Sequence, residues 1–512
     1  MSILEAKSLT FSYGDEQLYQ NTDIRFFEGE HAVLVGPNGS GKSTLLKLFK
    51  KELKPDNGTI EWLPTKQVGY LDQYAKIDGD RLVRHYLYEV FLPLFEKEKQ
   101  MENLYEQIAT VDENEYDRIL ERASKLGDEL VESDFYAIKS KVGDIIHGLG
   151  LSMDLLDDPI KHLSGGMRAK IILAKLLLEE ADVLLLDEPT NFLDVKHIEW
   201  LTRFLNQYPK AFLVVSHHEE FLRAIATTVF AIENKAVVRY KGDYDFYVKE
   251  RILREEQHKK SFKSQQAFIA RTEDFIQKNI TRDKTSKRAQ SRRKMLGKLD
   301  RIARPTKSRT YKFFFPLSRS TGRDVLVTKD LEIGYDEVLV EPITMTIMRE
   351  EKVVITGKNG IGKSTLLKTV LDVIEPLGGS YTWIDTAKIA YFEQESNLEK
   401  ALTPFQIVHN QYPDFTIQQV MSLLGGHGID YEMARRKIGT LSGGEQTKVR
   451  LALLRHQKGN VLIIDEPTNH LDAAAKEALK EALIAYKGTL ILVSHEKAFY
   501  EAICDYEISL YA

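Results

Sequence analysis

The sequence predicts an α/β protein in which one domain occurs twice in tandem. Four blocks recur in the same order: GPNGSGKST and GKNGIGKST at 36–44 and 357–365, LSGG at 163–166 and 441–444, DEPTN at 187–191 and 465–469, and SH at 216–217 and 494–495. Apolar runs such as HAVLV and VLLLD precede several blocks and are typical of buried parallel strands. Two segments with few Gly and Pro residues indicate helical additions to the duplicated domain.

The composition narrows the class of protein. At 512 residues the chain is too long for one core, and 43% hydrophobic with 29% charged residues is typical of a soluble globular protein. No apolar run approaches the roughly 20 residues that span a bilayer, and the N-terminus lacks the pattern of a secretion signal. The one cysteine, Cys504, excludes an internal disulfide and a thiolate metal site. We therefore expect a cytoplasmic protein without a membrane domain.

The first copy contains an insertion. Lys42 and Lys363 are 321 positions apart, whereas Asp187 and Asp465 are 278 apart, so the first copy holds about 43 extra residues. They precede its LSGG block, where Leu, Tyr and Ile recur at three- and four-residue spacing. This spacing predicts two amphipathic helices, broken near 110–114. We expect a projecting helical arm at about 82–142; the alternative is a helical subdomain packed on the domain.

A basic segment joins the copies. Helical stretches at 249–278 and 287–304 predict an antiparallel hairpin with its tip at about 279–287. Residues 251–310 hold 19 Lys and Arg against 6 Asp and Glu, a net charge of +13, although the whole chain carries −5. Such charge suits RNA phosphates; the alternative is a solvated basic helix pair. The candidate RNA-binding residues are Lys284, Lys287, Arg288 and Arg292.

These patterns divide the chain into three parts. The first domain spans 1–242, the interdomain linker 243–305 and the second domain 306–512.

Each GxxxxGK[ST] block follows a strand-like run and precedes a helical one, as a P-loop requires. Its glycines let backbone N–H groups point at phosphate oxygens. The lysine would reach the β- and γ-phosphates of ATP, and the serine hydroxyl is placed for Mg²⁺. The predicted nucleotide-binding residues are Gly36, Asn38, Gly39, Gly41, Lys42, Ser43 and Thr44, and Gly357, Asn359, Gly360, Gly362, Lys363, Ser364 and Thr365.

Two acids end each apolar run of the DEPTN block. Asp187 and Asp465 would hold Mg²⁺, usually through water. Glu188 and Glu466 follow one residue later, where a strand end can aim a carboxylate at a water in line with the γ-phosphate. They are the candidate general bases; the alternative is a surface acid at a strand end.

Three further pairs of residues are placed to act at these sites. A histidine at a strand end can contact the γ-phosphate and hold the attacking water, an aromatic residue upstream of the P-loop can stack on adenine, and a glutamine after a strand can sense Mg²⁺ and water. A structural histidine and a packing aromatic are the alternatives. These pairs are His217 and His495, Tyr13 and Tyr335, and Gln73 and Gln394.

The LSGG block discriminates between classes of P-loop protein. Its small residues precede a helical run and so form a helix N-terminus suited to an anion. A P-loop domain does not need a second phosphate-binding helix for its own nucleotide. The residues concerned are Ser164, Gly165, Gly166, Ser442, Gly443 and Gly444.

P-loop, LSGG, DEPTN-x-LD and SH in this order resemble the ATP-binding cassette ATPases. In that family two cassettes pair head to tail, so that the LSGG of one caps the ATP held by the P-loop of the other. The resemblance implies a monomer with two internal composite sites. Site one would join the first P-loop to Ser442 and site two the second P-loop to Ser164, and Asp194 and Asp472 match the D-loop aspartate of the family.

Two tandem cassettes, an arm in the first and a basic linker resemble the ABC-F proteins over nearly the whole chain. The resemblance implies binding to the ribosome near the tRNA exit site, with the linker directed at 23S rRNA, P-site tRNA and the peptidyl-transferase centre. Such proteins are translation factors or antibiotic-resistance proteins, and the short polar tip favours action through P-site tRNA. One alternative is the soluble ATPase subunit of an exporter. The other is a DNA-repair cassette ATPase, but such proteins carry zinc cysteines or far longer coiled coils, and this sequence has neither.

The first cassette departs from the family pattern at three positions. Met167 stands where cassette signatures usually have Gln, Phe192 stands where the second copy has His, and His218 stands where an acid is common. We therefore expect the two sites to differ in ATP turnover. Because both catalytic glutamates are present, we expect neither site to be inactive.

Overall fold

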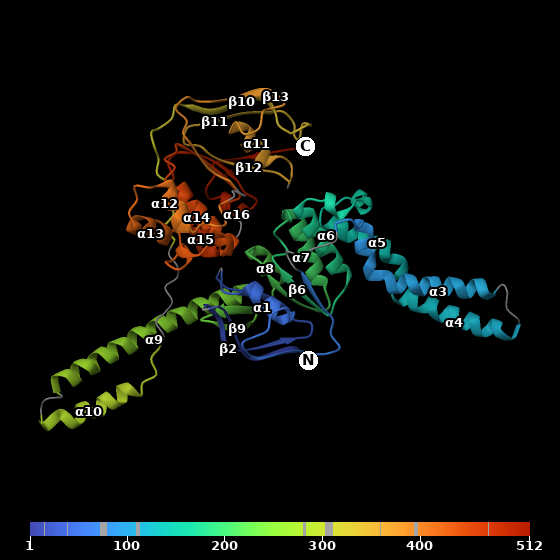
Figure 1. Cartoon of the computed structure of the whole chain (residues 1–512), viewed down its shortest axis with the longest axis horizontal. Helices are drawn as coiled ribbons and strands as arrows, with labels where there is room; N and C mark the ends of the chain where they lie inside the picture. The colour runs from blue at the N-terminus through green and yellow to red at the C-terminus, as the bar shows by residue number, and fades with distance from the viewer. Residues whose placement is uncertain are drawn as a thin grey trace.

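The computed structural model describes residues 1–14, 16–37, 39–71, 79–108, 113–279, 283–302, 311–358, 360–393, 398–468 and 471–511. These residues form two α/β domains from which two pairs of helices extend (Figure 1). The predicted fold class, two tandem P-loop domains with an arm and a hairpin linker, is confirmed. The residue boundaries assigned to the three parts of the chain stay predictions.

The strand order shows the duplication directly. Each domain contains a three-stranded antiparallel sheet and a larger sheet, and the orders β5-β6-β7-β3-β8 and β14-β15-β16-β12-β17 are equivalent and parallel. Only the first domain adds an antiparallel edge strand, β9, among the residues that the structure describes. The strands of the first domain are β1 Ser2–Tyr13, β2 Glu16–Phe27, β3 His31–Val35, β4 Asn57–Trp62, β5 Val68–Leu71, β6 Val183–Asp187, β7 Ala211–Val215, β8 Thr228–Glu233 and β9 Ala236–Lys241. Those of the second are β10 Asp324–Glu332, β11 Ile343–Met348, β12 Lys352–Thr356, β13 Gly378–Trp383, β14 Ile389–Phe392, β15 Val461–Asp465, β16 Thr489–Val493 and β17 Tyr506–Ser509.

The central strands are buried on both faces, as their continuous apolar sequences predict. In β6, Val183 and Leu185 belong to one core cluster, while Leu184 and Leu186 belong to the cluster on the opposite face. Both clusters form because successive side chains of a strand point to opposite sides. The acids that follow these strands are thereby held at the edge of a rigid sheet.

Helices cover the sheets. In the first domain they are α1 Lys42–Phe49, α2 Val83–Tyr88, α3 Leu92–Ile108, α4 Glu113–Glu132, α5 Ile138–Gly148, α6 Gly165–Leu178, α7 Val195–Gln207 and α8 Glu219–Ile225. In the second they are α11 Lys363–Val370, α12 Pro404–Gln411, α13 Ile417–Gly426, α14 Gly443–Leu454, α15 Ala473–Ala485 and α16 Lys497–Tyr500. Among the described residues, no helix is both long enough and apolar enough to cross a membrane.

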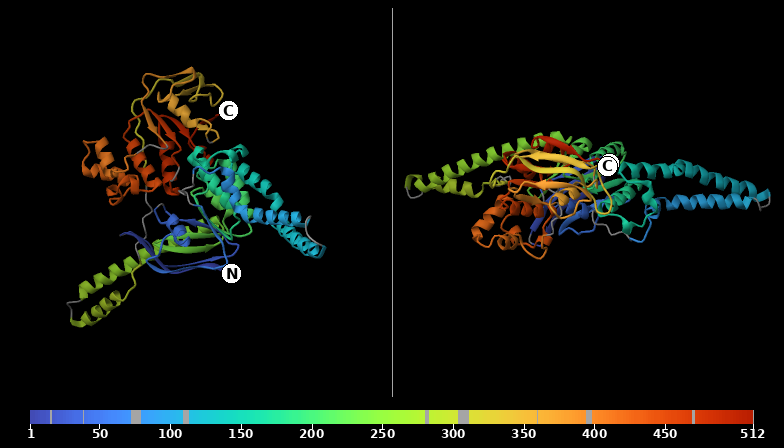
Figure 2. Two further views of the ribbon diagram at one scale, coloured as in Figure 1. Left: turned by 45° about the vertical axis from the view of Figure 1, so that its right-hand side comes forward. Right: turned by 90° about the horizontal axis from the view of Figure 1, so that it is seen from above.

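The inserted segment forms a projecting arm. Helices α3 and α4 lie side by side and extend away from the first domain (Figures 1 and 2). Lys97 Nζ lies 2.8 Å from Glu129 Oε2 and ties the two helices together. At the base, Lys175 of α6 pairs with Glu89 Oε2 at 2.7 Å and lies over the Tyr86 ring. The arm is thus attached to the helix that begins at LSGG. Much of the predicted break near 110–114 lies outside the described residues.

The basic linker forms a helical hairpin of α9 (Tyr244–Asn279) and α10 (Asp283–Gly297). It extends away from the arm (Figure 2). Ile269, Thr272 and Ala289 are buried in the hairpin, and Gln265 Nε2 donates to Asp300 O at 2.8 Å.

Both helices of the hairpin differ from the expected bounds. α9 begins before the predicted 249 because the Asp243 carboxylate accepts a hydrogen bond from Phe246 N at 2.7 Å and caps the helix. α10 begins at Asp283 rather than 287. It ends at Gly297 rather than 304, since Gly is a poor helix former.

Two glycines of α5 provide a test of packing. A Cβ at Gly148 would lie 1.9 Å from Trp200 Cε2, whereas a Cβ at Gly143 would meet only Met153 Sδ at 4.0 Å. We expect Gly148→Ala to lower the free energy of unfolding of the first domain by about 2 kcal/mol through overpacking. Gly143→Ala, the matched control, should stabilise the helix by up to about 1 kcal/mol. Thermal unfolding followed by calorimetry separates them, and equal midpoints would contradict the packing of α5 on α7.

Candidate active sites

Each P-loop wraps around its lysine at the start of a helix. The side chain of Lys42 donates to two carbonyls of its own loop at 2.9 and 3.3 Å, and Lys363 repeats these bonds at 2.8 and 3.0 Å. Gly41 (φ 97°) and Gly362 (φ 114°) adopt a left-handed backbone that glycine accommodates at little cost. The lysines are 9% and 7% exposed. Each loop therefore holds a nearly buried cation beside a helix N-terminus, which is an anion-binding arrangement.

Four predicted nucleotide-site residues lie outside the described residues. They are Asn38, Gln73, Asn359 and Gln394. Of the predicted adenine-stacking residues, Tyr13 is 52% exposed and Tyr335 is 65% exposed, so both rings present area to a ligand.

The second domain brings together a hydroxyl and a carboxylate that fit Mg²⁺. Ser364 Oγ donates to Asp465 Oδ2 at 2.8 Å. Asp465 is 2% exposed, and its Oδ1 has no hydrogen-bond partner among the described residues. Burial raises the pKa of Asp465 to about 6. Mg²⁺ prefers hard oxygen ligands, so these two residues would hold the ion. Asp187, 6% exposed, ends the equivalent strand of the first domain, and Ser43 begins its helix α1 next to Lys42.

A glutamate and a histidine meet at each site. Glu188 Oε1 lies 3.3 Å from His217 Nε2, and Glu466 Oε1 lies 2.9 Å from His495 Nε2. The sequence placed all four residues at strand ends but did not predict these contacts. The signal in the sequence was that the DE and SH blocks follow each other in the same order in both copies. The structure shows that the strands before these blocks are neighbours, β6 with β7 and β15 with β16.

Both glutamates have a strained backbone. Their φ angles are 51° and 47°, a left-handed conformation that is uncommon outside glycine. Each backbone N–H donates to the last residue of the neighbouring strand, Glu188 to Val215 O at 2.8 Å and Glu466 to Val493 O at 3.0 Å. Burial raises the pKa of Glu188, and Lys42 opposes that shift. Strain that persists at a strand end is a feature of functional sites, and a carboxylate of raised pKa suits a general base.

The second P-loop faces the LSGG block of the first domain. A cavity of about 570 Å³ is lined by Lys363, Ser364, Asp465, Glu466 and His495 from one side and by Ser164 and Gly166 from the other. Ser164 caps α6 by accepting from Met167 N at 3.2 Å. The N-terminus of α6 therefore opens toward the P-loop of the other domain.

The first P-loop lies opposite the second LSGG block. A Cβ at Gly39 would lie 3.5 Å from Glu445 Oε1, just after LSGG in the second domain. Ser442 caps α14, and Glu445 Oε2 accepts from Ser442 N at 2.8 Å. Asp472 of the second domain also acts on the charge of Lys42. The two domains thus face each other head to tail.

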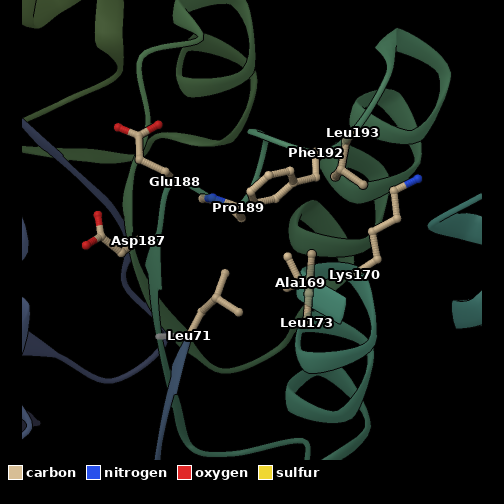
Figure 3. A pocket seen from close by; sticks show the side chains of 9 residues that line it. All are labelled: Leu71, Ala169, Lys170, Leu173, Asp187, Glu188, Pro189, Phe192 and Leu193. Atoms are coloured by element: carbon tan, nitrogen blue, oxygen red, sulfur yellow. The ribbon is translucent and has the colours of Figure 1, made fainter. Parts of the chain in front are cut away.

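The three departures of the first domain surround the second P-loop. Met167, Phe192 and His218 all line the 570 Å³ cavity. Phe192 packs on the signature, since a Cβ at Gly166 would lie 3.5 Å from its ring. Figure 3 shows a second, smaller pocket within the first domain, with Phe192, Leu193 and Lys170 on one side and the carboxylates of Asp187 and Glu188 on the other. Residues that belong to the first domain in sequence therefore shape the wall of site two.

Two cassettes that face each other with P-loop against LSGG define an ATP-binding cassette ATPase. A family model described as "ABC transporter" matches residues 19–191 and 340–469, and an extension model of the same description matches 230–313. Domains of this family bind ATP with Mg²⁺ and hydrolyse ATP.

Curated relatives cover almost the whole chain. An uncharacterized ABC transporter ATP-binding protein, YfmM of Bacillus subtilis, is 41% identical over 98% of this chain and 96% of its own length. ABC transporter F family member 2 of Arabidopsis thaliana is 32% identical over 98% of this chain and 75% of its own. The chain belongs to the ABC-F subfamily of ATP-binding cassette proteins. Among solved structures, an archaeal ribosome recycling factor, aABCE1, has a TM-score of 0.59 at 20% identity over 99% of this chain and 87% of its own, which shows the shared fold.

The buried carboxylate of Asp465 predicts a stability effect with a definite sign. Because the pKa of Asp465 is raised from 3.8 to about 6, ionisation of this carboxyl costs folding stability. The cost is absent below pH 3.8, grows as the pH rises, and is complete once the pH has passed through 6. We expect Asp465→Asn to raise the stability of the nucleotide-free second cassette by about 1 to 3 kcal/mol near neutral pH. The gain should shrink at about pH 5, as thermal unfolding at both pH values would measure.

Two further measurements separate this effect from general stabilisation. Asp414→Asn, which removes an exposed carboxylate from the same cassette, should shift the midpoint little. Mg²⁺ with ATP should stabilise the wild-type chain more than the Asp465→Asn chain. A destabilised variant near neutral pH would contradict the predicted sign.

Proposed function

We propose that this chain is an ATP-driven factor that binds the ribosome near the tRNA exit site and acts through its hairpin on P-site tRNA and the peptidyl-transferase centre. The observation that carries the proposal is the head-to-tail cavity, in which Lys363 and Glu466 of one cassette face Ser164 of the other. ATP bound there would contact both cassettes. Since the hairpin joins the two cassettes, closure on ATP would set the position of the hairpin.

The residues of each site have distinct roles in this proposal. Lys363 binds phosphate oxygens, and the N-terminus of α6 from the other cassette binds them from the opposite side. Glu466 accepts a proton from the attacking water, and His495 orients the carboxylate. Ser364 and Asp465 would hold Mg²⁺, and the ion would supply positive charge next to the phosphates. Site one uses Lys42, Ser43, Asp187, Glu188 and His217 in the same way.

ATP shifts the population of open and closed cassettes. The closed form has the nucleotide between the cassettes and is the form that binds the ribosome, whereas hydrolysis removes the γ-phosphate contacts and favours opening. A ribosomal partner is also consistent with two structures of similar fold. One contains an archaeal ribosome recycling factor in complex with a ribosomal stalk protein, and the other contains archaeal ABCE1 bound to the ribosome.

The hairpin supplies the RNA-binding surface. Lys287 and Arg288 are exposed near the start of α10, one helical turn from the tip. The Arg292 guanidinium lies 3.9 Å from the centroid of the Phe275 ring of α9, so this residue also holds the two helices together. The side chain of Lys284 lies outside the described residues. We assign direct phosphate contact to Lys287 and Arg288 first.

The short tip favours a translation factor. Only three residues, 280–282, separate α9 from α10. A tip of this length suits contact with P-site tRNA, whereas a long apolar loop would reach drug sites deep in the peptidyl-transferase centre. Antibiotic resistance is the competing role within the family, and a changed drug susceptibility on overexpression would favour it.

Removal of the general bases tests the catalytic proposal. We expect Glu188→Gln and Glu466→Gln each to lower ATP turnover, and the double variant to lower it at least about 100-fold, since general-base catalysis contributes at least that factor. The double variant should also stay on ribosomes when ATP is present. Steady-state phosphate release and co-sedimentation measure the two effects. Equal co-sedimentation of the wild type and the double variant would contradict the proposed release step.

Removal of charge near the tip tests the RNA-binding role of the hairpin. We expect Lys287→Gln with Arg288→Gln to weaken ribosome binding and to reduce the dependence of log affinity on log salt by about 2, because each substitution leaves one RNA phosphate without its cation. Lys329→Gln with Lys487→Gln removes the same charge from exposed positions of the second cassette and serves as the control. Co-sedimentation with membranes instead of ribosomes would favour the exporter subunit.

A further inference from the structure

Tyr311 lies at the start of the second domain, just after the interdomain linker, and bonds to the D-loop of the second cassette. Its hydroxyl donates to Asp472 Oδ2 at 2.8 Å. Lys448 Nζ donates to the same carboxylate oxygen and to the Tyr311 hydroxyl, both at 2.9 Å. The Lys448 side chain is 1% exposed. We call Tyr311, Lys448 and Asp472 the Tyr311 cluster.

The Tyr311 ring is held in one place. It stacks on Phe313 with ring centroids 5.9 Å apart and planes 5° from parallel. A Cβ at Gly428 would lie 2.3 Å from the Tyr311 ring, so the contact requires glycine there. The next residue, Lys312, donates its N–H to Gly426 O at 2.7 Å. The segment is thus anchored on the second cassette at and beside Tyr311.

The same segment is tied to the hairpin upstream. Ile302 N donates to Gln265 Oε1 of α9 at 2.8 Å. Tyr311 follows Ile302 by nine residues in the sequence. A chain of nine residues spans at most roughly 30 Å, so the base of the hairpin and the Tyr311 anchor are joined by a short stretch of backbone.

The first cassette has no equivalent cluster among the described residues. Asp194, the counterpart of Asp472, pairs with His197 Nδ1 at 2.6 Å within the same turn. Both aspartates cap the helix that follows, α7 or α15. Of these two aspartates, only Asp472 accepts a hydrogen bond from a tyrosine hydroxyl within the described part of the chain.

The two aspartates serve different sites. Asp472 is bonded to Lys448 of α14, and the N-terminus of this helix faces the first P-loop, since a Cβ at Gly39 would lie 3.5 Å from Glu445 Oε1. Asp194 stands between Leu193 and Val195, which line the cavity at the second P-loop. Asp472 therefore belongs to site one, although its chain position lies in the second cassette. We therefore expect a change in its position to act on site one rather than on site two.

We propose that Tyr311 is a positioning residue for site one. Its hydroxyl fixes Asp472 beside α14, the helix that faces the first P-loop, so that movement of the hairpin changes ATP turnover at site one and not at site two. The inference rests on the proposed function, because it requires two composite ATP sites. It adds a route from the hairpin to one of them.

Single-site enzymes separate the two sites. The Glu466→Gln chain retains site one, and the Glu188→Gln chain retains site two. We expect Tyr311→Phe to lower kcat about fivefold in the Glu466→Gln chain, with KM changed less than about twofold, because the substitution removes one hydrogen bond to a charged group. In the Glu188→Gln chain both parameters should be unchanged. Tyr412→Phe removes a hydroxyl bonded to Leu453 O at 3.2 Å in the same cassette and is the control.

Hydrogen exchange supplies a measurement that does not depend on turnover. In the full chain, Tyr311→Phe should speed amide exchange at 471–476 and leave exchange at 193–198 unchanged. Equal loss of kcat at both sites, or no loss at either, overturns the role of Tyr311. If neither single-site enzyme hydrolyses ATP, the proposed function fails. Amide exchange then tests the role of Tyr311 by itself, and unchanged exchange at 471–476 overturns the inference.

Discussion

A nearly buried lysine in each P-loop is the constraint on which the arrangement of the two cassettes depends. Burial lowers the pKa of Lys42 and of Lys363, and carboxylates oppose both shifts. Two of those carboxylates belong to the same cassette as the lysine, and a third comes from the D-loop of the other cassette. A buried cation without its counter-charges is strongly destabilising. Head-to-tail pairing therefore completes the electrostatics of each site before any nucleotide adds its own charge.

The two projecting elements are attached to equivalent places in this arrangement. The arm base pairs with Lys175 on α6, and the segment after the hairpin bonds to Lys448 on α14. Both helices begin at LSGG, the part of each cassette that faces the P-loop of the other. In the proposed mechanism, movement of α6 or α14 on closure would therefore reach an element that extends far from the ATP sites. Both attachments use hydrogen bonds donated by a lysine ammonium, which are shorter and stronger than hydrogen bonds between neutral groups.

The sequence predicted what repeats or has a fixed period. The four blocks revealed the duplication, continuous apolar runs indicated strands such as β6, and helical spacing indicated the arm and the hairpin. Contacts between distant segments carried no such signal. The approach of His495 to Glu466 depends on β15 and β16 being neighbours, which the sequence does not state. Tyr311 stood in a stretch without any motif, so nothing in the sequence linked it to Asp472.

The three departures in the first cassette show that the domain to which a residue belongs does not decide which ATP site it lines. Met167, Phe192 and His218 line the cavity at the second P-loop, where the proposed catalytic residues Glu466 and His495 belong to the second cassette. The corresponding wall of site one carries the Glu445 carboxylate near Gly39. The Met167 thioether is only a weak hydrogen-bond acceptor, whereas an ionised carboxylate accepts several hydrogen bonds. The two proposed sites therefore repeat the same glutamate and histidine and differ in the wall opposite the P-loop, so we expect a difference in turnover to originate in closure rather than in the chemistry of Glu188 and Glu466.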